Sequence, residues 1–398
     1  MNETTDIILS LGSILLLGMA ADFLGKRTFL PRITILLILG ILIGQEVFNL
    51  IPTSISTLFE LVSNITLIMV GFLIGGKLSK SLILRSAKSI MWISMTAALG
   101  AIIIVGGGLL MIGIPKEIAI LLACISAATA PGATVDLVIE SGSESSFSKK
   151  LLAIVALDDV WGLVIFSIGL SVVAFFVQSN GTESRILAAL WDIIGAVLLG
   201  AFLGYPAAHL SGRLRPGRPM FAEALGLVLF CGGLALWLDV SFIIASMVMG
   251  AMIRNFAEHH EYGFHEIEDI EWPFMIVFFI LAGASLQFDA VQLVLFSGGF
   301  YIALRAAGKI IGSYLGALIS DSNKITKNWM GLALLPQAGV AIGMALVATN
   351  QFPQYRDNIL PIVIFSTIFF EIIGPVFTRL ALSKADKLIE KNIDEFSE

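Results

Sequence analysis

Long apolar stretches separated by short polar ones run through almost the whole chain. Most are as long as the roughly 20 residues that a helix needs to cross the hydrocarbon core of a bilayer. Lipid offers no partner to unpaired backbone groups, and the runs are too long for the strands of a membrane barrel. The pattern predicts an all-α polytopic membrane protein with thirteen transmembrane helices. The runs fall at 6–24, 33–50, 57–76, 87–113, 117–139, 150–177, 188–210, 220–238, 240–255, 270–287, 291–319, 328–348 and 357–382.

Composition supports this class. Of the 398 residues, 57% are hydrophobic and only 14% are charged, which excludes a soluble globular protein of this length. The two cysteines, Cys124 and Cys231, both lie in apolar runs and do not resemble a disulfide framework or a metal cluster. The N-terminal segment MNETTD is acidic, so we expect the first run to remain as a helix and not to be a signal peptide.

Lysine and arginine indicate the orientation. With the N-terminus outside and the spans alternating, nineteen of the 24 basic residues fall on the inside, three fall outside, and Arg305 and Lys309 lie within a span. An excess of basic residues on the cytoplasmic side is the usual signature of topology. We therefore expect a multi-pass protein of the cell (inner) membrane with its C-terminus in the cytoplasm.

Two apolar runs carry a proline near their centre. The fifth contains TAPGATVDLV, where the helix should break around Ala130, Pro131 and Gly132. The twelfth contains LLPQAGVAIG, with Pro336 and Gln337 at the corresponding place. Proline lacks an amide hydrogen and disrupts a helix interior, although membrane helices also tolerate simple proline kinks.

The two interrupted runs occupy matching positions in the chain. Each is the fourth of a block of five runs, 33–177 and 240–382. An odd number of spans in each block gives the blocks opposite orientations. Matching interrupted spans in two inverted halves point to the binding site of a secondary transporter.

Two adjacent carboxylates, Asp158 and Asp159, lie inside the run 150–177. An aspartate at the centre of a membrane helix costs about 2.5–3.5 kcal/mol even on insertion scales, so the default interpretation is an ion or proton site. Neighbouring carboxylates repel each other, and burial also favours the neutral form, so one of them should hold a proton near neutral pH. A group in that state can exchange a proton for a small cation.

Basic partners are available in the eleventh run. Arg305 and Lys309 are four residues apart and share one helix face, and either could pair with one of the two aspartates. A fixed ion pair that only holds helices together explains one aspartate but not two. The hydroxyls of Thr129 and Ser126, with carbonyls freed at a broken helix, would complete an oxygen site at the other aspartate that suits an alkali cation.

The charged residues and broken helices together resemble a known family. The segments ALDDVWGLVIFS, TAPGATVDLV, FFILAGASL, RAAGKIIGSYLGA and LLPQAGVAIG are similar to the monovalent cation/proton antiporter superfamily, in its two-aspartate branch. The resemblance covers nearly the whole chain. It implies a transporter and not an enzyme, without a cofactor, and a homodimer that works in membrane lipid and binds no nucleic acid. It also implies two inverted five-helix repeats with crossed discontinuous helices.

The same resemblance implies how the chain is divided. A dimer or scaffold domain comprises 1–76 and 219–287, and a core transport domain comprises 87–177 and 291–382. Residues 188–210 form a linker helix and 383–398 a short cytoplasmic tail. The core would move against the dimer domain as an elevator.

Individual roles follow from the resemblance as well. Asp159 is the main carrier of cation and proton, and Asp158 pairs with a basic residue. Lys309 matches the lysine of this branch and Arg305 the arginine used elsewhere in the superfamily, so either could be that partner. Many relatives carry a glutamate where this chain has Asn64, and Glu371 is a candidate to replace that carboxylate. The implied reaction is exchange of Na⁺, and of Li⁺ as well, for H⁺.

Other functions fit less well. A K⁺/H⁺ antiporter of the same fold is the main alternative, and a sodium-coupled carrier of organic solutes would not need a basic residue facing the aspartates. An intramembrane aspartyl protease takes its two aspartates from different helices, and a passive channel needs no paired broken helices.

The longest inside loop, near 254–271, carries His259, His260 and His265. It is either an ordinary solvated loop or a pH-modulating one, because histidine titrates near neutrality.

Overall fold

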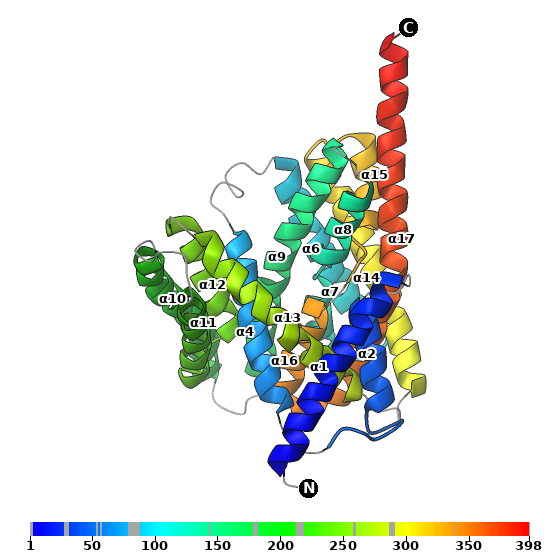
Figure 1. The fold of residues 1–398 in the computed structure, drawn as a ribbon. Helices are drawn as coiled ribbons and strands as arrows, with labels where there is room; N and C mark the ends of the chain where they lie inside the picture. Colours follow the sequence, from blue (N-terminus) through cyan, green and yellow to red (C-terminus); the bar gives the residue numbers. More distant parts are fainter. Residues whose placement is uncertain are drawn as a thin grey trace. The chain divides into compact units, whose positions relative to one another are not determined.

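The computed structural model shows a helical chain, drawn in Figure 1. It describes residues 3–27, 32–52, 55, 58–78, 88–141, 143, 145–177, 182–211, 219–257, 260–285, 291–337 and 339–397. The elements are α1 (Glu3–Arg27), α2 (Arg32–Ile43), α4 (Phe59–Lys77), α6 (Lys88–Met111), α7 (Lys116–Ser126), α8 (Pro131–Ser141), α9 (Ser146–Val177), α10 (Thr182–Ser211), α11 (Pro219–Trp237), α12 (Phe242–Phe256), α13 (His260–Ala284), α14 (Val291–Ile319), α15 (Lys324–Ala333), α16 (Gly339–Gln351), the 3₁₀ helix η1 (Pro353–Tyr355) and α17 (Arg356–Ser397).

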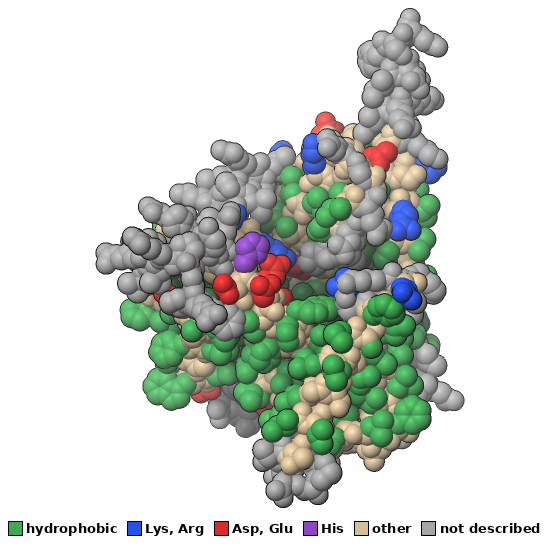
Figure 2. Space-filling view, viewed as in Figure 1, with side chains coloured by type: hydrophobic (Ala, Val, Ile, Leu, Met, Phe, Trp, Pro, Cys, Tyr) green, Lys and Arg blue, Asp and Glu red, His purple; other side chains and the backbone are tan. Residues whose placement is uncertain are grey.

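Seven helical segments among the described residues are long and apolar enough to cross a membrane. They lie in α1, α4, α6, α9, α10, α14 and the stretch of η1 and α17. Many large apolar side chains remain exposed: on α1, Leu16 and Met19 are 64% and 66% accessible. Figure 2 shows such side chains covering much of one face. Exposed apolar surface on this scale is expected where lipid is the solvent.

The chain divides into two compact units. Unit 1 contains residues 1–24, 36–85 and 163–286, and unit 2 contains residues 25–35, 86–162 and 287–398. Three helices contribute to both units, because α1 changes unit after residue 24, α2 after residue 35 and α9 after residue 162.

Unit 1 is held together by α4, α10, α11, α12 and α13. Its buried core includes Met69, Phe72, Val228, Ala245 and Met249. Phe72 stacks on Phe264 with ring centroids 4.7 Å apart, which joins α4 to α13. Ser241 caps the N-terminus of α12 by accepting a hydrogen bond from the Ile244 amide at 3.3 Å.

Unit 2 is built around the pair α6 and α14, whose backbones touch. A Cβ atom on Gly308 would lie 2.6 Å from Cα of Ala101, and one on Gly312 would lie 3.0 Å from Cα of Ala97. Only glycine permits this spacing, and small residues at helix contacts are typical of membrane proteins. The close contact fixes α14, which carries both intramembrane basic residues, against α6.

The structure corrects the expected helix boundaries in two places. The first break covers residues 127–130, so Pro131 and Gly132 start α8 and do not lie in the gap. Proline suits this first helical position because its missing amide hydrogen would have no partner there. The prediction of a loop at 254–271 is wrong at both ends, because α12 continues to Phe256 and α13 already begins at His260. Acidic residues in the first turns of α13 favour a helix N-terminus.

Candidate functional site

Two pairs of short helices meet in the middle of unit 2. The helix pairs α7 and α8, and α15 and α16, are each interrupted by an extended segment. The amide of Ala130 in the first break donates a hydrogen bond to the carbonyl of Pro336 in the second, at 2.9 Å. The two breaks, which the sequence places about 200 residues apart, therefore contact each other directly.

The breaks leave helix C-terminal carbonyls without partners in their own helices. Such carbonyls carry partial negative charge and need donors when they are buried. Arg305 supplies three: its guanidinium donates to the carbonyls of Ser126, Ala128 and Leu335, at 3.2, 2.7 and 2.8 Å. The guanidinium also lies 4.4 Å from the centre of the Phe370 ring. Arg305 thus binds the ends of both interrupted helices.

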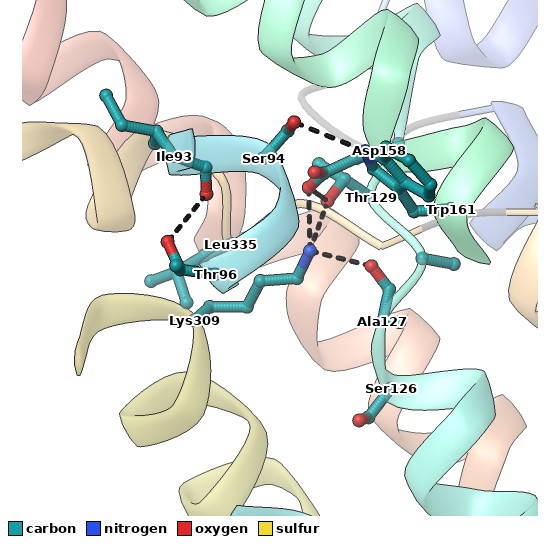
Figure 3. A network of polar contacts seen from close by, with 12 residues as sticks. Ile93, Ser94, Thr96, Ser126, Ala127, Thr129, Asp158, Trp161, Lys309 and Leu335 are labelled. Atoms are coloured by element: carbon teal, nitrogen blue, oxygen red, sulfur yellow. Dashed lines mark hydrogen bonds and ion pairs between the residues drawn. The ribbon is translucent and has the colours of Figure 1, made fainter. Parts of the chain in front are cut away.

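Lys309 occupies the next turn of α14 and makes a different set of contacts (Figure 3). Its ammonium lies 2.7 Å from Oδ2 of Asp158, 2.7 Å from the carbonyl of Ala127 and 2.9 Å from Oγ1 of Thr129. Lys309 and Asp158 are both fully buried. Of the two basic residues that the sequence offered as partners, Lys309 is therefore the one that forms the ion pair.

Thr129 links the break to the aspartates. Its hydroxyl donates to Oδ2 of Asp158 at 2.7 Å and accepts from Lys309. The other carboxylate oxygen of Asp158, Oδ1, has no hydrogen-bond partner among the described residues. A buried carboxylate oxygen in that state is an available ligand for a cation or a proton.

Asp159 follows on α9 and is 1% exposed. Its charge acts on the Lys309 ammonium together with that of Asp158. Trp161 on the same helix donates to Oγ of Ser94 on α6 at 3.3 Å, and Gly162 lies against Ala128. These contacts hold the aspartates beside the break between α7 and α8.

Other expected residues lie elsewhere. The hydroxyl of Ser126 donates to the Ala123 carbonyl at 2.6 Å, so Ser126 meets the site through its carbonyl. Glu371, on α17, accepts a hydrogen bond from Thr34, and no hydrogen bond among the described residues joins it to the aspartates. Asn64 is half-buried on α4 in unit 1.

The histidines are only partly described. His265 is exposed on α13, with Nδ1 3.5 Å from a carboxylate oxygen of Glu268. His260 begins α13, and its side chain lies outside the described part of the chain, as does the whole of His259.

Gln337 belongs to a polar group that sequence reasoning did not anticipate. Its amide donates to the hydroxyl of Tyr301 at 3.5 Å and its carbonyl accepts from Ser366 at 3.4 Å. Tyr301, Arg305 and Lys309 are spaced by four residues on α14, so all three side chains share one face. That spacing was the available signal for Tyr301.

Known proteins share this architecture. The family of transmembrane sodium/hydrogen exchangers matches residues 11–384. In structure, the sodium proton antiporter MjNhaP1 from Methanocaldococcus jannaschii is similar, with a TM-score of 0.72 and 21% identity over 96% of this chain and 97% of that one.

Relatives in sequence are distant but span almost the full length. The chain is 22% identical to the ammonium/H⁺ antiporter subunit AmhT of Alkalihalophilus pseudofirmus, over 97% of this chain and 98% of that protein. It is 26% identical to the probable Na⁺/H⁺ antiporter GerT of Bacillus cereus, over 88% and 93%. It is 24% identical to the Na⁺/H⁺-K⁺ antiporter GerN of the same organism, over 95% and 96%. The chain, an all-helical multi-pass membrane protein, belongs to the sodium/hydrogen exchanger family of transporters.

Proposed function

We propose that the protein is a secondary active antiporter that exchanges a monovalent cation, Na⁺ and also Li⁺, for H⁺ at Asp158 and Asp159. The observation that carries the proposal is the arrangement of two buried carboxylates beside one buried ammonium at a helix break. One carboxylate balances Lys309, so the second adds a negative charge that only a proton or a bound cation can neutralise inside the protein.

The exchange step follows from this charge balance. In the proton-loaded state Asp159 is neutral, and Lys309 and Asp158 neutralise each other. A Na⁺ ion that enters the site binds the ionised Asp159, whose proton leaves to the same side. Asp158 Oδ1 and the hydroxyl of Thr129 are the further oxygen ligands, and oxygen ligands suit an alkali cation. Cation and proton therefore compete for one carboxylate.

Lys309 and Arg305 have separate roles in this mechanism. Lys309 touches the carboxylate that takes part in binding, and a desolvated lysine can lose its proton, whereas arginine cannot. Arg305 holds the carbonyl ends of the two broken helices and keeps the breaks in place. We assign charge compensation to Lys309 and positioning of the break to Arg305.

Transport itself requires that the site open alternately to the two sides. We propose an elevator mechanism in which a core domain, 87–177 and 291–382, moves against a dimer domain, 1–76 and 219–287. Residues 188–210 serve as the linker helix and 383–398 as a cytoplasmic tail. Two compact units and two paired helix breaks support a two-domain arrangement, although residues 25–35 group with unit 2 and residues 163–177 with unit 1. The proposal includes thirteen spans and two inverted repeats.

We further propose that the protein is a homodimer in the cell membrane. The distribution of basic residues favours an orientation with the N-terminus outside and the C-terminus in the cytoplasm. K⁺/H⁺ exchange is the second candidate, because one similar protein is by name a Na⁺/H⁺-K⁺ antiporter.

Reconstitution decides between these functions. Proteoliposomes with an internal pH dye are exposed in turn to Na⁺, Li⁺ and K⁺, with and without a clamped voltage. We expect Na⁺ and Li⁺ to release internal protons and K⁺ to do so weakly. A response to K⁺ alone would overturn the choice of Na⁺, and no response to any cation would overturn the antiport proposal.

A further inference from the structure

Glu371 is a fully buried carboxyl group that the exchange site does not use. It lies on α17 and is 3% exposed. Its carboxylate accepts hydrogen bonds from both the hydroxyl and the backbone amide of Thr34. No ion pair among the described residues includes it. Both of these hydrogen-bond donors belong to one residue of α2.

The position of Thr34 explains the contact. It is the third residue of α2 (Arg32–Ile43), and the first turn of that helix contains no acidic residue. Amides in the first turn have no partner within their own helix, and the N-terminus carries partial positive charge. Glu371 therefore does from α17 what an N-cap residue normally does from the adjacent chain.

The surroundings offer the carboxyl group a second partner. Thr367 lies one turn earlier on α17, is fully buried, and its hydroxyl has no hydrogen-bond partner among the described residues. Residues four apart share a helix face, and side chains lean toward the N-terminus, so Glu371 leans toward Thr367. A protonated carboxyl group needs an acceptor for its hydrogen, and the Thr367 hydroxyl can accept one.

Charged groups lie on α2 and on the helices that pack against α17, and α17 itself carries Arg356, Asp357 and Arg379. Arg32 is exposed at the start of α2, and Arg305 is stacked on Phe370 and bound to three carbonyls. On α14, Lys309 is paired with Asp158. The remaining charged residues on helices that pack against α17 are Lys116 and Glu117 on α7, Asp136 and Glu140 on α8, and Lys324 and Lys327 on α15.

We propose that Glu371 is a proton-dependent cap of α2. When ionised it accepts from both donors of Thr34 and anchors the first turn of α2 to α17. When protonated it loses most of its strength as an acceptor, turns to donate its hydrogen to Thr367, and frees the first turn. This residue acts by positioning a helix, and the proposal does not depend on which cation the exchange site carries.

The consequence for the chain lies in the path of α2. Residues 32–35 belong to unit 2 and residues 36–43 to unit 1. The first turn of α2 therefore belongs to the same unit as α17. In the proposal, the protonation state of Glu371 decides whether this turn stays fixed to α17 at a given pH.

Hydrogen exchange tests the proposal on the full chain in lipid nanodiscs. Protection of peptides covering residues 32–36, corrected for intrinsic rates, is compared between about pH 5 and pH 8.5, a range that a buried glutamate can titrate through. Losing a cap typically changes a local opening equilibrium by about fivefold. We expect wild-type protection to fall by about that factor at the acid end.

Matched variants separate a switch from simple packing. Glu371→Gln keeps the shape and an acceptor oxygen but cannot ionise, so its protection should be intermediate and constant with pH. Thr34→Val removes one donor and should lower protection while the pH dependence persists. Thr378→Val, elsewhere on α17, is the control and should match the wild type. Wild-type protection that is constant with pH, or a Glu371→Gln variant that keeps the wild-type pH dependence, would overturn the proposal.

Discussion

The ammonium of Lys309 lies 2.7 Å from Oδ2 of Asp158, and both side chains are inaccessible to solvent. The pair joins α14 to α9 at the break that follows α7. Because Asp159 is adjacent and also buried, removing any one of the three charges leaves a different imbalance.

Asp159→Asn should abolish cation-dependent proton release while the protein remains folded. The amide keeps the shape of the side chain and removes a buried charge, so burial becomes less costly. Proton flux in proteoliposomes and a thermal melt measure the two effects. Asp321→Asn, an exposed site with positive φ that asparagine tolerates, is the control and should exchange normally. Sodium-driven flux retained in Asp159→Asn would remove this residue from the mechanism.

Lys309→Gln should destabilise the protein by several kcal/mol, since breaking a buried ion pair from one side costs about 3–5 kcal/mol. The double variant Lys309→Gln with Asp158→Asn should recover much of the loss, because neither charge is then stranded. Melting temperatures of the single and double variants in detergent check this. If the double variant were no more stable than the single one, the pair would not contribute as the geometry indicates.

Arg305→Gln should also destabilise the protein, but Asp158→Asn should not rescue it. The guanidinium binds three carbonyls of the broken helices, and these remain unsatisfied whatever happens to the aspartate. Recovery of stability in the Arg305→Gln and Asp158→Asn double variant would reassign the ion pair to arginine.

Apparent affinity for Na⁺ should increase as pH rises between about 6 and 8.5, because the cation binds only after the shared carboxylate releases its proton. The sign is fixed by competition: protons raise the concentration of Na⁺ needed for half-maximal flux. Flux titrations at several pH values measure it. A half-maximal Na⁺ concentration that is constant over this range would contradict direct competition.

Replacing His259, His260 and His265 together by glutamine should shift the pH profile without abolishing exchange. His265 is exposed on α13, near Glu268 and outside the candidate exchange site. The maximal rate at the best pH should stay within about twofold of wild type, as we expect for residues outside the candidate exchange site. Loss of exchange at every pH would contradict a purely modulating role for these residues.

The sequence predicted which residues carry the chemistry better than it predicted which of them contact each other. Charged residues inside long apolar runs are conspicuous. Their positions in these runs were therefore enough to select Asp158, Asp159, Arg305 and Lys309. Which base pairs with Asp158 depends on the rotation of α14 against α6, which the pattern does not contain. The hydroxyl of Thr129 meets Asp158, as a ligand near the break should, whereas that of Ser126 bonds to its own helix. A serine in the last turn of a helix can do either.

Other features were not predicted correctly from the sequence. Glu371 reads as another buried acid, and its partner Thr34 is 337 residues away. Helix boundaries also depended on local chemistry: proline at the first position of α8 moved the break toward its N-terminal side. Acidic residues extended α13 into the expected loop, because charge near a helix start stabilises it even when hydropathy is low.

The glycine contact between α6 and α14 has a mechanical consequence. Backbones that meet at Gly308 and Gly312 leave little space between α6 and α14, so we expect the two helices to move together. The pair of helices would then carry Arg305 and Lys309, both on α14, as one rigid unit. A covalent cross-link between α6 and α14 should therefore be silent in transport, and this pair offers an attachment point for distance probes that report on motion of the site without disturbing it.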